Sequence, residues 1–540
     1  MYLLWISGLS LVAYGIALYL GRIFRHRQLA KQTCVLDIDS LGLRLPHEKI
    51  KGTAVICGGS IGGLLAARVC HDHFDNVVIV EPETWMNTPD ATRVDPWNQQ
   101  SKRSRVMQYD SLHIILPMGY KALAKLFPNI EEQGKASSIK VGPSSWPVHF
   151  WGNDTRSPDA EYGGTLPKSI YTGRAGIETL LRRLVLGEDY KNVRQVIGTV
   201  TGISRNANSP EFIDQVTVRT SEGIRTIPAA LVVDCTGVAA AGMKWLRREG
   251  YGFADRYGRN QLPLDELKIA YDQKLHYTTL QFRITPELGR KLPGLPVPYD
   301  ECWGIYNNLA DSRTENRCIY SGRVDEDTIQ FCFSAMGESE LPKTLEDAKT
   351  CARSLVTEKP IPETFFQMLD MLDEVKDTMT CSQVRYLGSS YIRYERAANL
   401  PENWIALGDS VMNINPIYGQ GCSKASFGVI CLHKLLMTST TIPRDFSKKY
   451  FSIHAEKIRP LWASLKVSDY SFPTTIPLPG ETLSKGSWLR WYMKKLTVLS
   501  FTEDDQAGSV LWHVRCLLAP PTDALHPRLI LKVFLSLIIG

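Results

Sequence analysis

Residues 53–81 read TAVICGGSIGGLLAARVCHDHFDNVVIVE. An apolar run of strand length is followed by a glycine-rich corner, a helix-forming stretch and a second apolar run that ends in Glu81. Two apolar runs separated by a helical stretch are typical of parallel strands joined by a crossover helix. The stretch therefore predicts one βαβ unit at the start of an α/β sheet.

The glycine corner, residues 58–63, has the composition of a dinucleotide-binding turn. Gly58 allows the tight turn, Gly63 lets the helix approach the strand, and the helix N-terminus offers N–H groups to a pyrophosphate. Ser60 replaces the middle glycine of the strict G-x-G-x-x-G motif. Glu81, eighteen residues after Gly63, is placed to accept hydrogen bonds from ribose hydroxyls. An acid there would repel a 2′-phosphate, so this site predicts FAD or NAD rather than NADP.

A second signal lies in residues 404–426, WIALGDSVMNINPIYGQGCSKAS, which predict a strand, a Gly-Asp corner, a proline turn and a glycine-rich helix start. The spacing G-D-x(6)-P-x-x-G-Q-G resembles the second FAD motif of the group A flavoprotein monooxygenases. The resemblance implies that Asp409 binds the ribityl chain of FAD. It also implies that the segment at Pro416, Gly419 and Gly421 covers the flavin ring. The second signal therefore favours FAD over NAD.

Three further stretches carry the same resemblance. Residues 104–128 match the segment that places polar side chains against the flavin ring, here Arg105 and Gln108. Residues 172–184 match the helix start whose arginine, here Arg174, reaches FAD. LVVDCTG (231–237) takes the place of the family's Asp-Gly motif, and Asp234 there either contacts the flavin or caps a turn.

The order Asp-Cys-Thr-Gly departs from the aromatic hydroxylases and is closer to the squalene epoxidase, halogenase and lycopene cyclase branches. Segments such as WLRREGYG, LPENWIALGD and LLAPPTDALHPRLILKVF resemble the bacterial polyether alkene epoxidases. The likeness extends over most of residues 52–535.

The two ends of the chain are apolar. Residues 2–20 carry no charge and are long enough to cross a bilayer, so residues 1–21 are predicted as a transmembrane anchor. Residues 22–50 are then a juxtamembrane linker, and its basic residues, Arg22, Arg25, Arg27 and Lys31, predict a cytosolic body, with the endoplasmic reticulum as the expected membrane. The final LILKVFLSLIIG is too short to span, and either lies in the membrane interface or packs on the body.

The expected fold is α/β, with a Rossmann-like FAD-binding layer of the glutathione-reductase type. Residues 51–244 and 391–440 are assigned to that layer, residues 245–390 to an inserted β-rich substrate domain, and residues 441–540 to a helical C-terminal region with an apolar tail. Aromatic residues of the inserted domain are expected in the hydrophobic core or on the wall of a substrate pocket: Tyr277, Phe282, Phe331 and Phe333.

Composition argues against other partners. The 62 basic and 56 acidic residues nearly balance, and no basic run or zinc-finger pattern points to nucleic acid. Twelve cysteines are scattered without a C-x-x-C pair, and His71 and His73 lie two apart on a predicted helix, so no metal site is expected. The cysteine pattern suits reduced thiols.

The resemblance implies a monooxygenase that uses NAD(P)H and O2 to epoxidise or hydroxylate an alkene-bearing or aromatic, terpenoid- or polyketide-like molecule of secondary metabolism. The predicted anchor favours a lipophilic substrate, because a molecule dissolved in the membrane would enter directly. Oxygen transfer would occur through a flavin C4a-hydroperoxide, so no side chain is assigned as catalytic. A flavin halogenase is one alternative, although Trp146 and Trp151 do not fit the spacing of its W-x-W-x-I-P segment. The others are a non-oxygenating flavoprotein isomerase or cyclase, and a non-catalytic binding module, against which Glu81 and Asp409 argue.

Overall fold

The computed structural model describes residues 2–43, 49–501 and 504–539, without the side chains of residues 2–14, 17 and 539. A five-stranded parallel sheet has the order β20-β12-β1-β2-β8. Its strands are β1 (Ile50–Cys57), β2 (Phe74–Glu81), β8 (Val193–Ile197), β12 (Leu231–Asp234) and β20 (Trp404–Ala406). Helix α2 (Ile61–His73) joins β1 to β2, so the βαβ unit and the mixed α/β fold are confirmed.

Helix α2 is buried along nearly its whole length. It packs between the sheet, α5 (Arg174–Val185) and α10 (Gly421–Leu436), which explains why its apolar residues show no single face. Around this layer lie helices α3 (Pro117–Leu126) and α4 (Ile130–Ala136), and two antiparallel sheets. Their strands are β9 (Thr199–Arg205), β10 (Ile213–Thr220) and β11 (Gly223–Pro228), and β3 (Leu112–Ile115), β7 (Lys168–Gly173) and β4 (Lys140–Pro143).

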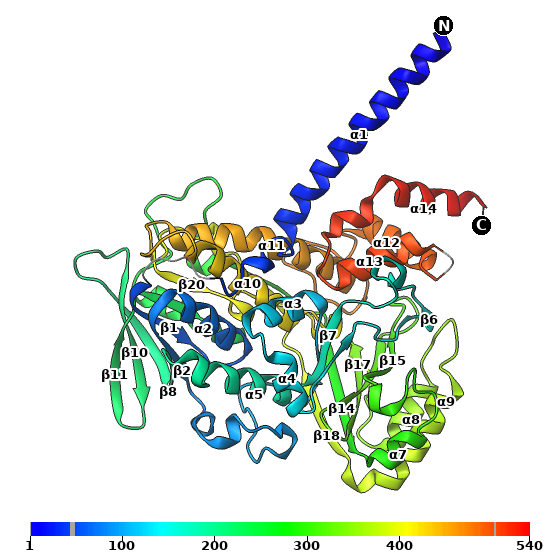
Figure 1. The fold of residues 1–540 in the computed structure, drawn as a ribbon, viewed down its shortest axis with the longest axis horizontal. Coiled ribbons are helices and arrows are strands. Elements are labelled where there is room, and N and C mark those ends of the chain that lie inside the picture. Colours follow the sequence, from blue (N-terminus) through cyan, green and yellow to red (C-terminus); the bar gives the residue numbers. More distant parts are fainter. Residues whose placement is uncertain (1, 44–48, 502–503, 540) are drawn as a thin grey trace.

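The second large body is a seven-stranded sheet of order β18-β14-β17-β16-β15-β5-β6. Helices α7 (Pro286–Lys291), α8 (Leu345–Arg353) and α9 (Glu363–Met371) lie beside it (Figure 1). Its strands are β14 (Leu275–Arg283), β15 (Gly304–Leu309), β16 (Arg317–Val324), β17 (Thr328–Met336), β18 (Thr380–Arg385), β5 (Val148–Phe150) and β6 (Asn153–Asp154).

The predicted division of domains at residue 244 does not follow this sheet. Strands β5 and β6 come from the segment assigned to the FAD-binding layer, yet β5 pairs with β15. Three-residue strands carry too little alternation to be recognised in a sequence. A small sheet of β13 (Lys268–Tyr271), β19 (Ser389–Ile392) and β21 (Met412–Asn413) likewise joins the inserted segment to residues assigned to the FAD-binding layer.

Helix α1 (Tyr2–Gln32) projects away from the body (Figure 1). The first part of the predicted linker therefore continues this helix, because residues 22–32 contain neither glycine nor proline to end it. Most of the predicted anchor, residues 1–21, falls on side chains outside the described part. Within the described residues, no helix is both long and apolar enough to cross a membrane.

The C-terminal region is helical, as predicted. It contains α11 (Phe446–Asp469), α12 (Ser487–Leu499), α13 (Asp505–Arg515), the 3-10 turn η14 (Pro521–Leu525) and α14 (Pro527–Ile539). Leu529 and Val533 of α14 are buried in a small core with Tyr492 and Leu496 of α12. The tail therefore packs on the body along one face.

Candidate functional site

One cavity of about 1540 Å³ lies between the two large sheets and the C-terminal helices. This exceeds the roughly 300–1,000 Å³ of ordinary single-ligand sites, so it has room for a large cofactor and a second molecule. Ten of the twelve predicted site residues line it: Gly58, Ser60, Glu81, Arg105, Gln108, Arg174, Asp409, Pro416, Gly419 and Gly421. Gly63 and Asp234 lie behind its wall.

The glycine corner is shaped by close backbone contacts. Gly58 has a φ of 115°, and a Cβ there would lie 2.4 Å from the carbonyl oxygen of Cys235. A Cβ on Gly63 would lie 1.8 Å from the carbonyl oxygen of Gly58. Gly58 therefore lets the corner approach the chain that follows β12, and Gly63 lets α2 approach the corner. The first turn of α2, at Ile61 and Gly62, faces the cavity, where its N–H groups have no partner within the helix. Such a turn fits a pyrophosphate.

A buried ion cluster stands beside this corner. Glu178 binds Arg103, the Arg174 Nε at 3.3 Å and the Arg182 Nη2 at 3.2 Å, and it accepts a hydrogen bond from the Ser60 hydroxyl at 2.7 Å. Burial alone would raise the pKa of Glu178, but the three arginine charges outweigh it and hold that pKa at about 2. Glu178 is therefore ionised throughout the neutral range.

Arg174 connects the cluster to the cavity. Its Nη2 donates to the Ser60 hydroxyl at 2.8 Å, and its side chain is 13% exposed, at the cavity wall next to the first turn of α2. A guanidinium at a helix N-terminus is a suitable partner for phosphate oxygens. The residues present at this end therefore fit the diphosphate of a dinucleotide.

Glu81 is already engaged by protein donors. Its Oε2 accepts from the Gly59 N–H at 3.0 Å, its Oε1 accepts from the Glu83 N–H at 3.1 Å, and Arg103 lies 3.2 Å away. The carboxylate is thus fixed at the cavity wall, at the end of β2. Binding of a ribose by Glu81 stays a prediction.

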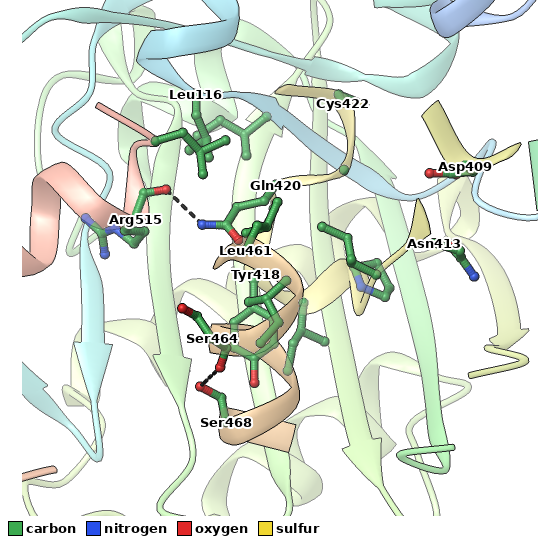
Figure 2. Close-up of a pocket in the computed structure, with 18 of the residues that line it drawn as sticks. Leu116, Asp409, Asn413, Tyr418, Gln420, Cys422, Leu461, Ser464, Ser468 and Arg515 are labelled. Carbon is green, nitrogen blue, oxygen red and sulfur yellow. Dashed lines mark hydrogen bonds between the residues drawn. The ribbon is translucent and has the colours of Figure 1, made fainter. Parts of the chain in front are cut away.

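Asp409 has a buried partner that the sequence analysis did not identify. Lys424, whose side chain is 2% exposed, donates to the Asp409 Oδ1 at 2.8 Å and also to the Met412 carbonyl. The Asp409 side chain is 46% exposed and faces the cavity (Figure 2). Lys424 therefore holds the carboxylate in place while leaving it accessible to a ligand.

The segment 415–421, between β21 and α10, is held by hydrogen bonds to residues of α11 and α13. Asn415 Nδ2 and the Tyr418 hydroxyl donate to Asp469 at 2.8 and 3.0 Å, and the Tyr271 hydroxyl donates to the same carboxylate at 2.7 Å. Gln420 Nε2 donates to the Arg515 carbonyl at 3.1 Å (Figure 2). These contacts hold the segment predicted to cover a flavin ring against the cavity.

The Asp234 carboxylate is occupied by hydrogen bonds within the protein, two of them from backbone N–H groups. Its carboxylate accepts from the Thr236 N–H and the Gly242 N–H, each at 2.9 Å, and from the hydroxyls of Thr236 and Ser410. Burial raises the pKa of Asp234, while these four donors favour its charged form. Of the two roles left open by the sequence, the structure shows the turn-capping one, at the start of α6 (Gly242–Arg248).

Arg105 and Gln108 lie on the irregular segment before β3, at the cavity wall. The Arg105 N–H donates to Glu83 Oε1 at 3.0 Å, and the Gln108 carbonyl accepts from the Ser111 N–H at 3.1 Å. The main chain is thus fixed at both positions. Contact of their side chains with a flavin stays a prediction.

The seven-stranded sheet presents opposite characters on its two faces. Tyr277, Tyr320 and Ser334 face the cavity, and their buried hydroxyls have no hydrogen-bond partner among the described residues. The same holds for Tyr386, just after β18. The other face packs against α8 and α9 and contains Phe282, Phe331 and Phe333. Because side chains alternate along a strand, Tyr277 belongs to the pocket and the three phenylalanines to the core.

Several site residues were missed in the sequence: Arg103, Glu178, Arg182, Asn415, Lys424 and Asp469. One signal was present, because Arg174, Glu178 and Arg182 are spaced four apart on a predicted helix and so share a face. The others come together only through the tertiary fold. Across the described part of the chain, no three His, Cys, Asp or Glu residues are grouped to hold a metal ion.

Comparisons with known proteins agree with this architecture. No known family profile matches the chain. Protein Rv3254 of Mycobacterium tuberculosis is 23% identical over 452 residues, which cover 79% of this chain and 83% of that protein.

Among solved structures, the flavin-dependent brominase Bmp2 has a TM-score of 0.56 at 10% identity and covers 90% of this chain and 98% of its own. HpxO of Klebsiella pneumoniae, complexed with FAD and uric acid, has a TM-score of 0.50 at 16% identity and covers 87% and 97%. The p-nitrophenol 4-monooxygenase PnpA of Pseudomonas putida has a TM-score of 0.50 at 13% identity and covers 88% and 100%. The chain therefore has the fold of FAD-dependent monooxygenases and of a flavin-dependent halogenase.

Proposed function

We propose that this protein is an FAD-dependent monooxygenase that epoxidises or hydroxylates a lipophilic small molecule, with NAD(P)H as the reductant. The observation that carries the proposal is the single cavity that joins the glycine corner, Asp409 and the segment 415–421 to an apolar chamber. A fold shared with FAD-dependent monooxygenases supports it.

The described residues fit FAD in the order expected of its parts. The first turn of α2 and Arg174 would hold the diphosphate, Glu81 the adenosine ribose, Asp409 the ribityl chain and the segment 416–421 the ring. Bound FAD would supply electron transfer and oxygen activation. The chain itself would orient the two molecules and exclude water, because many apolar side chains line the cavity, among them Trp146, Phe150, Leu461, Phe472, Leu489 and Trp512.

That apolar wall also supports a lipophilic substrate. A terpenoid- or polyketide-like molecule would gain most of its binding free energy from contact with such a surface. The uncharged run at residues 2–20 supports an attachment to a membrane in which such a substrate dissolves, with the body on the cytosolic side.

A halogenase is less well supported. Two lysines line the cavity among the described residues, and both are ion-paired: Lys457 with Asp37 at 3.1 Å and Lys494 with Asp311 at 2.8 Å. A flavin halogenase is expected to have a lysine near the flavin tunnel, and neither of these two lysines is unpaired. The absence of a W-x-W-x-I-P segment from the sequence agrees with this.

The visible absorption spectrum of detergent-purified protein tests the proposal. We expect flavin bands that bleach with NADPH under anaerobic conditions and return when O2 is admitted. Bound flavin that shows no such cycle would favour an isomerase or cyclase, and protein without flavin would reject the proposal.

A matched pair of variants links the flavin to the glycine corner. Gly58→Ala should reduce flavin content, because its Cβ would meet the Cys235 carbonyl at 2.4 Å. Gly480→Ala is the control, since Gly480 also has a positive φ, of 79°, but has open space around it. Equal flavin content in the two variants would place the cofactor elsewhere.

A further inference from the structure

Helix α14 is apolar over most of its circumference, although it lies at the surface, and its polar stripe is limited to Arg528, Lys532 and Ser536. Leu529 and Val533 are buried against α12, while the opposite face exposes Leu531, Phe534, Leu535, Leu537 and Ile538, by 43% to 80%. Helices of soluble proteins usually carry polar residues on their outer face, and a contiguous exposed apolar patch commonly marks an interaction surface. One face of α14 packs on α12, and we expect its exposed apolar face to contact another apolar environment.

Helix α12 continues this exposed surface. Trp488 is 57% and Trp491 36% exposed, and the Trp491 ring lies 6.2 Å from that of Phe534 on α14. Tryptophan is favoured at membrane interfaces because its ring is apolar and its N–H is polar. The two helices thus form one apolar surface, called here the α12/α14 face.

Basic side chains accompany this face, although two of them, Arg490 and Lys494, line the cavity. Helix α12 carries Arg490, Lys494 and Lys495, α14 carries Arg528 and Lys532, and neither contains an acidic residue. Lys494 and Lys532 are paired with Asp311 and Asp504. The remaining cations are not neutralised by their own helices, although the whole chain is nearly balanced in charge. Lysines and arginines beside an apolar surface are attracted to anionic lipid headgroups.

The projecting helix α1 leaves the body on the same side (Figure 1). Arg25 of α1 pairs with Asp523 of η14 at 3.0 Å, which fixes α1 next to the α12/α14 face. The described part of α1 exposes apolar residues, among them Tyr19, Leu20 and Phe24, and it carries basic residues but no acidic ones. Three helices therefore direct apolar and basic side chains to one side of the molecule.

The cavity extends to the α12/α14 face. Leu489, Trp491 and Met493 of α12, and Thr522 and Leu525 of η14, line its apolar end. Trp491 and Leu525, which is 38% exposed, also take part in the outer surface. The wall of the cavity and the α12/α14 face thus share side chains.

We propose that the α12/α14 face binds to an anionic lipid bilayer and sets the apolar end of the cavity against the lipid. The role in substrate supply rests on the proposed function. A lipid surface is the occupant that accounts for the apolar face and for its basic surroundings together.

A probe at Leu535 tests the proposal in the full-length chain. Leu535→Cys, labelled with nitrobenzoxadiazole, is placed in a Cys381→Ser background, because Cys381 is the one exposed cysteine of the described chain. Vesicles of phosphatidylcholine with phosphatidylserine should shift its emission to the blue and raise it several-fold. Ile224→Cys is the control: Ile224 is 74% exposed and belongs to β11, which lies at the opposite end of the body from α14 (Figure 1). Both variants keep α1.

The outcomes separate the alternatives. No response at Leu535, or an equal response at Ile224, would overturn the proposal, as would an equal response to vesicles of phosphatidylcholine alone. A blue shift that appears without vesicles and grows with protein concentration would show that a second copy covers the face. Flavin absorbance is recorded on the same samples: a lipid response in protein that binds no flavin would support the α12/α14 face and reject the proposed function.

Discussion

At the glycine corner, every carboxylate oxygen of Glu81 and Glu178 already has a protein donor, whereas at the sheet end of the cavity the hydroxyls of Tyr277, Tyr320 and Ser334 have none among the described residues. At the first end the two carboxylates are held before a ligand arrives, although the Arg103 Nε has no hydrogen-bond partner among the described residues. The second leaves polar atoms that a ligand or water must satisfy, since a buried unpaired hydroxyl costs about 1–3 kcal/mol. This difference suits a site whose cofactor end is preorganised and whose substrate end is completed by the substrate.

The strongest test of the preorganised end is Glu178→Gln. The change leaves Arg103, Arg174 and Arg182 without their shared counter-charge in a buried place, and breaking such a cluster typically costs about 3–5 kcal/mol. We expect the free energy of unfolding, measured in denaturant, to fall by that amount and flavin content to fall with it.

Glu131→Gln is the matched control. Glu131 pairs with Lys168 at 2.8 Å, but both side chains are nearly half exposed, so the cost should stay below about 1 kcal/mol. Similar losses in the two variants would show that the buried cluster is not what organises this end.

The sequence was informative about the same end of the cavity. Close approach at Gly58 and Gly63 is a property of the backbone, and only glycine permits it, so the spacing is visible in the chain itself. The sheet, by contrast, gathers Tyr277, Tyr320 and Ser334 from three strands whose register no local pattern reveals. The contact of Asp469 with Asn415 across more than fifty residues was equally hidden. Site residues could thus be predicted where a short stretch of sequence determines the structure, and not where the tertiary fold brings distant residues together.

Asp469 lies between the two ends and gives a pH-dependent test. Burial raises its pKa from 3.8 to about 6, although three hydrogen-bond donors favour the ionised form. The folded protein therefore binds more protons than the unfolded chain between these values, so the contribution of Asp469 to stability falls as the pH rises through this window. The full effect is at most about 3 kcal/mol.

Asp469→Asn removes this titration. We expect wild-type protein to gain stability relative to the variant as the pH falls from neutral to about 4, in parallel denaturant titrations. Flavin absorbance of the variant at neutral pH reports whether the segment 415–421 keeps its position. If the free energies of unfolding of the two proteins change in parallel across this pH window, the pKa of Asp469 is not raised in the folded protein.

The smallest expected effect compares two tyrosines. Tyr277→Phe removes a buried hydroxyl without a described partner, so the free energy of unfolding should be unchanged or rise by up to about 1 kcal/mol. Tyr271→Phe removes the donor that lies 2.7 Å from Asp469 and should cost about 1–3 kcal/mol. Both are measured by denaturant unfolding of the flavin-loaded protein. If Tyr277→Phe costs as much as Tyr271→Phe, the Tyr277 hydroxyl has a partner before any substrate binds, and the contrast between the two ends of the cavity fails. If only Tyr271→Phe is costly, the open hydroxyls of the sheet become the positions at which to search for substrate contacts.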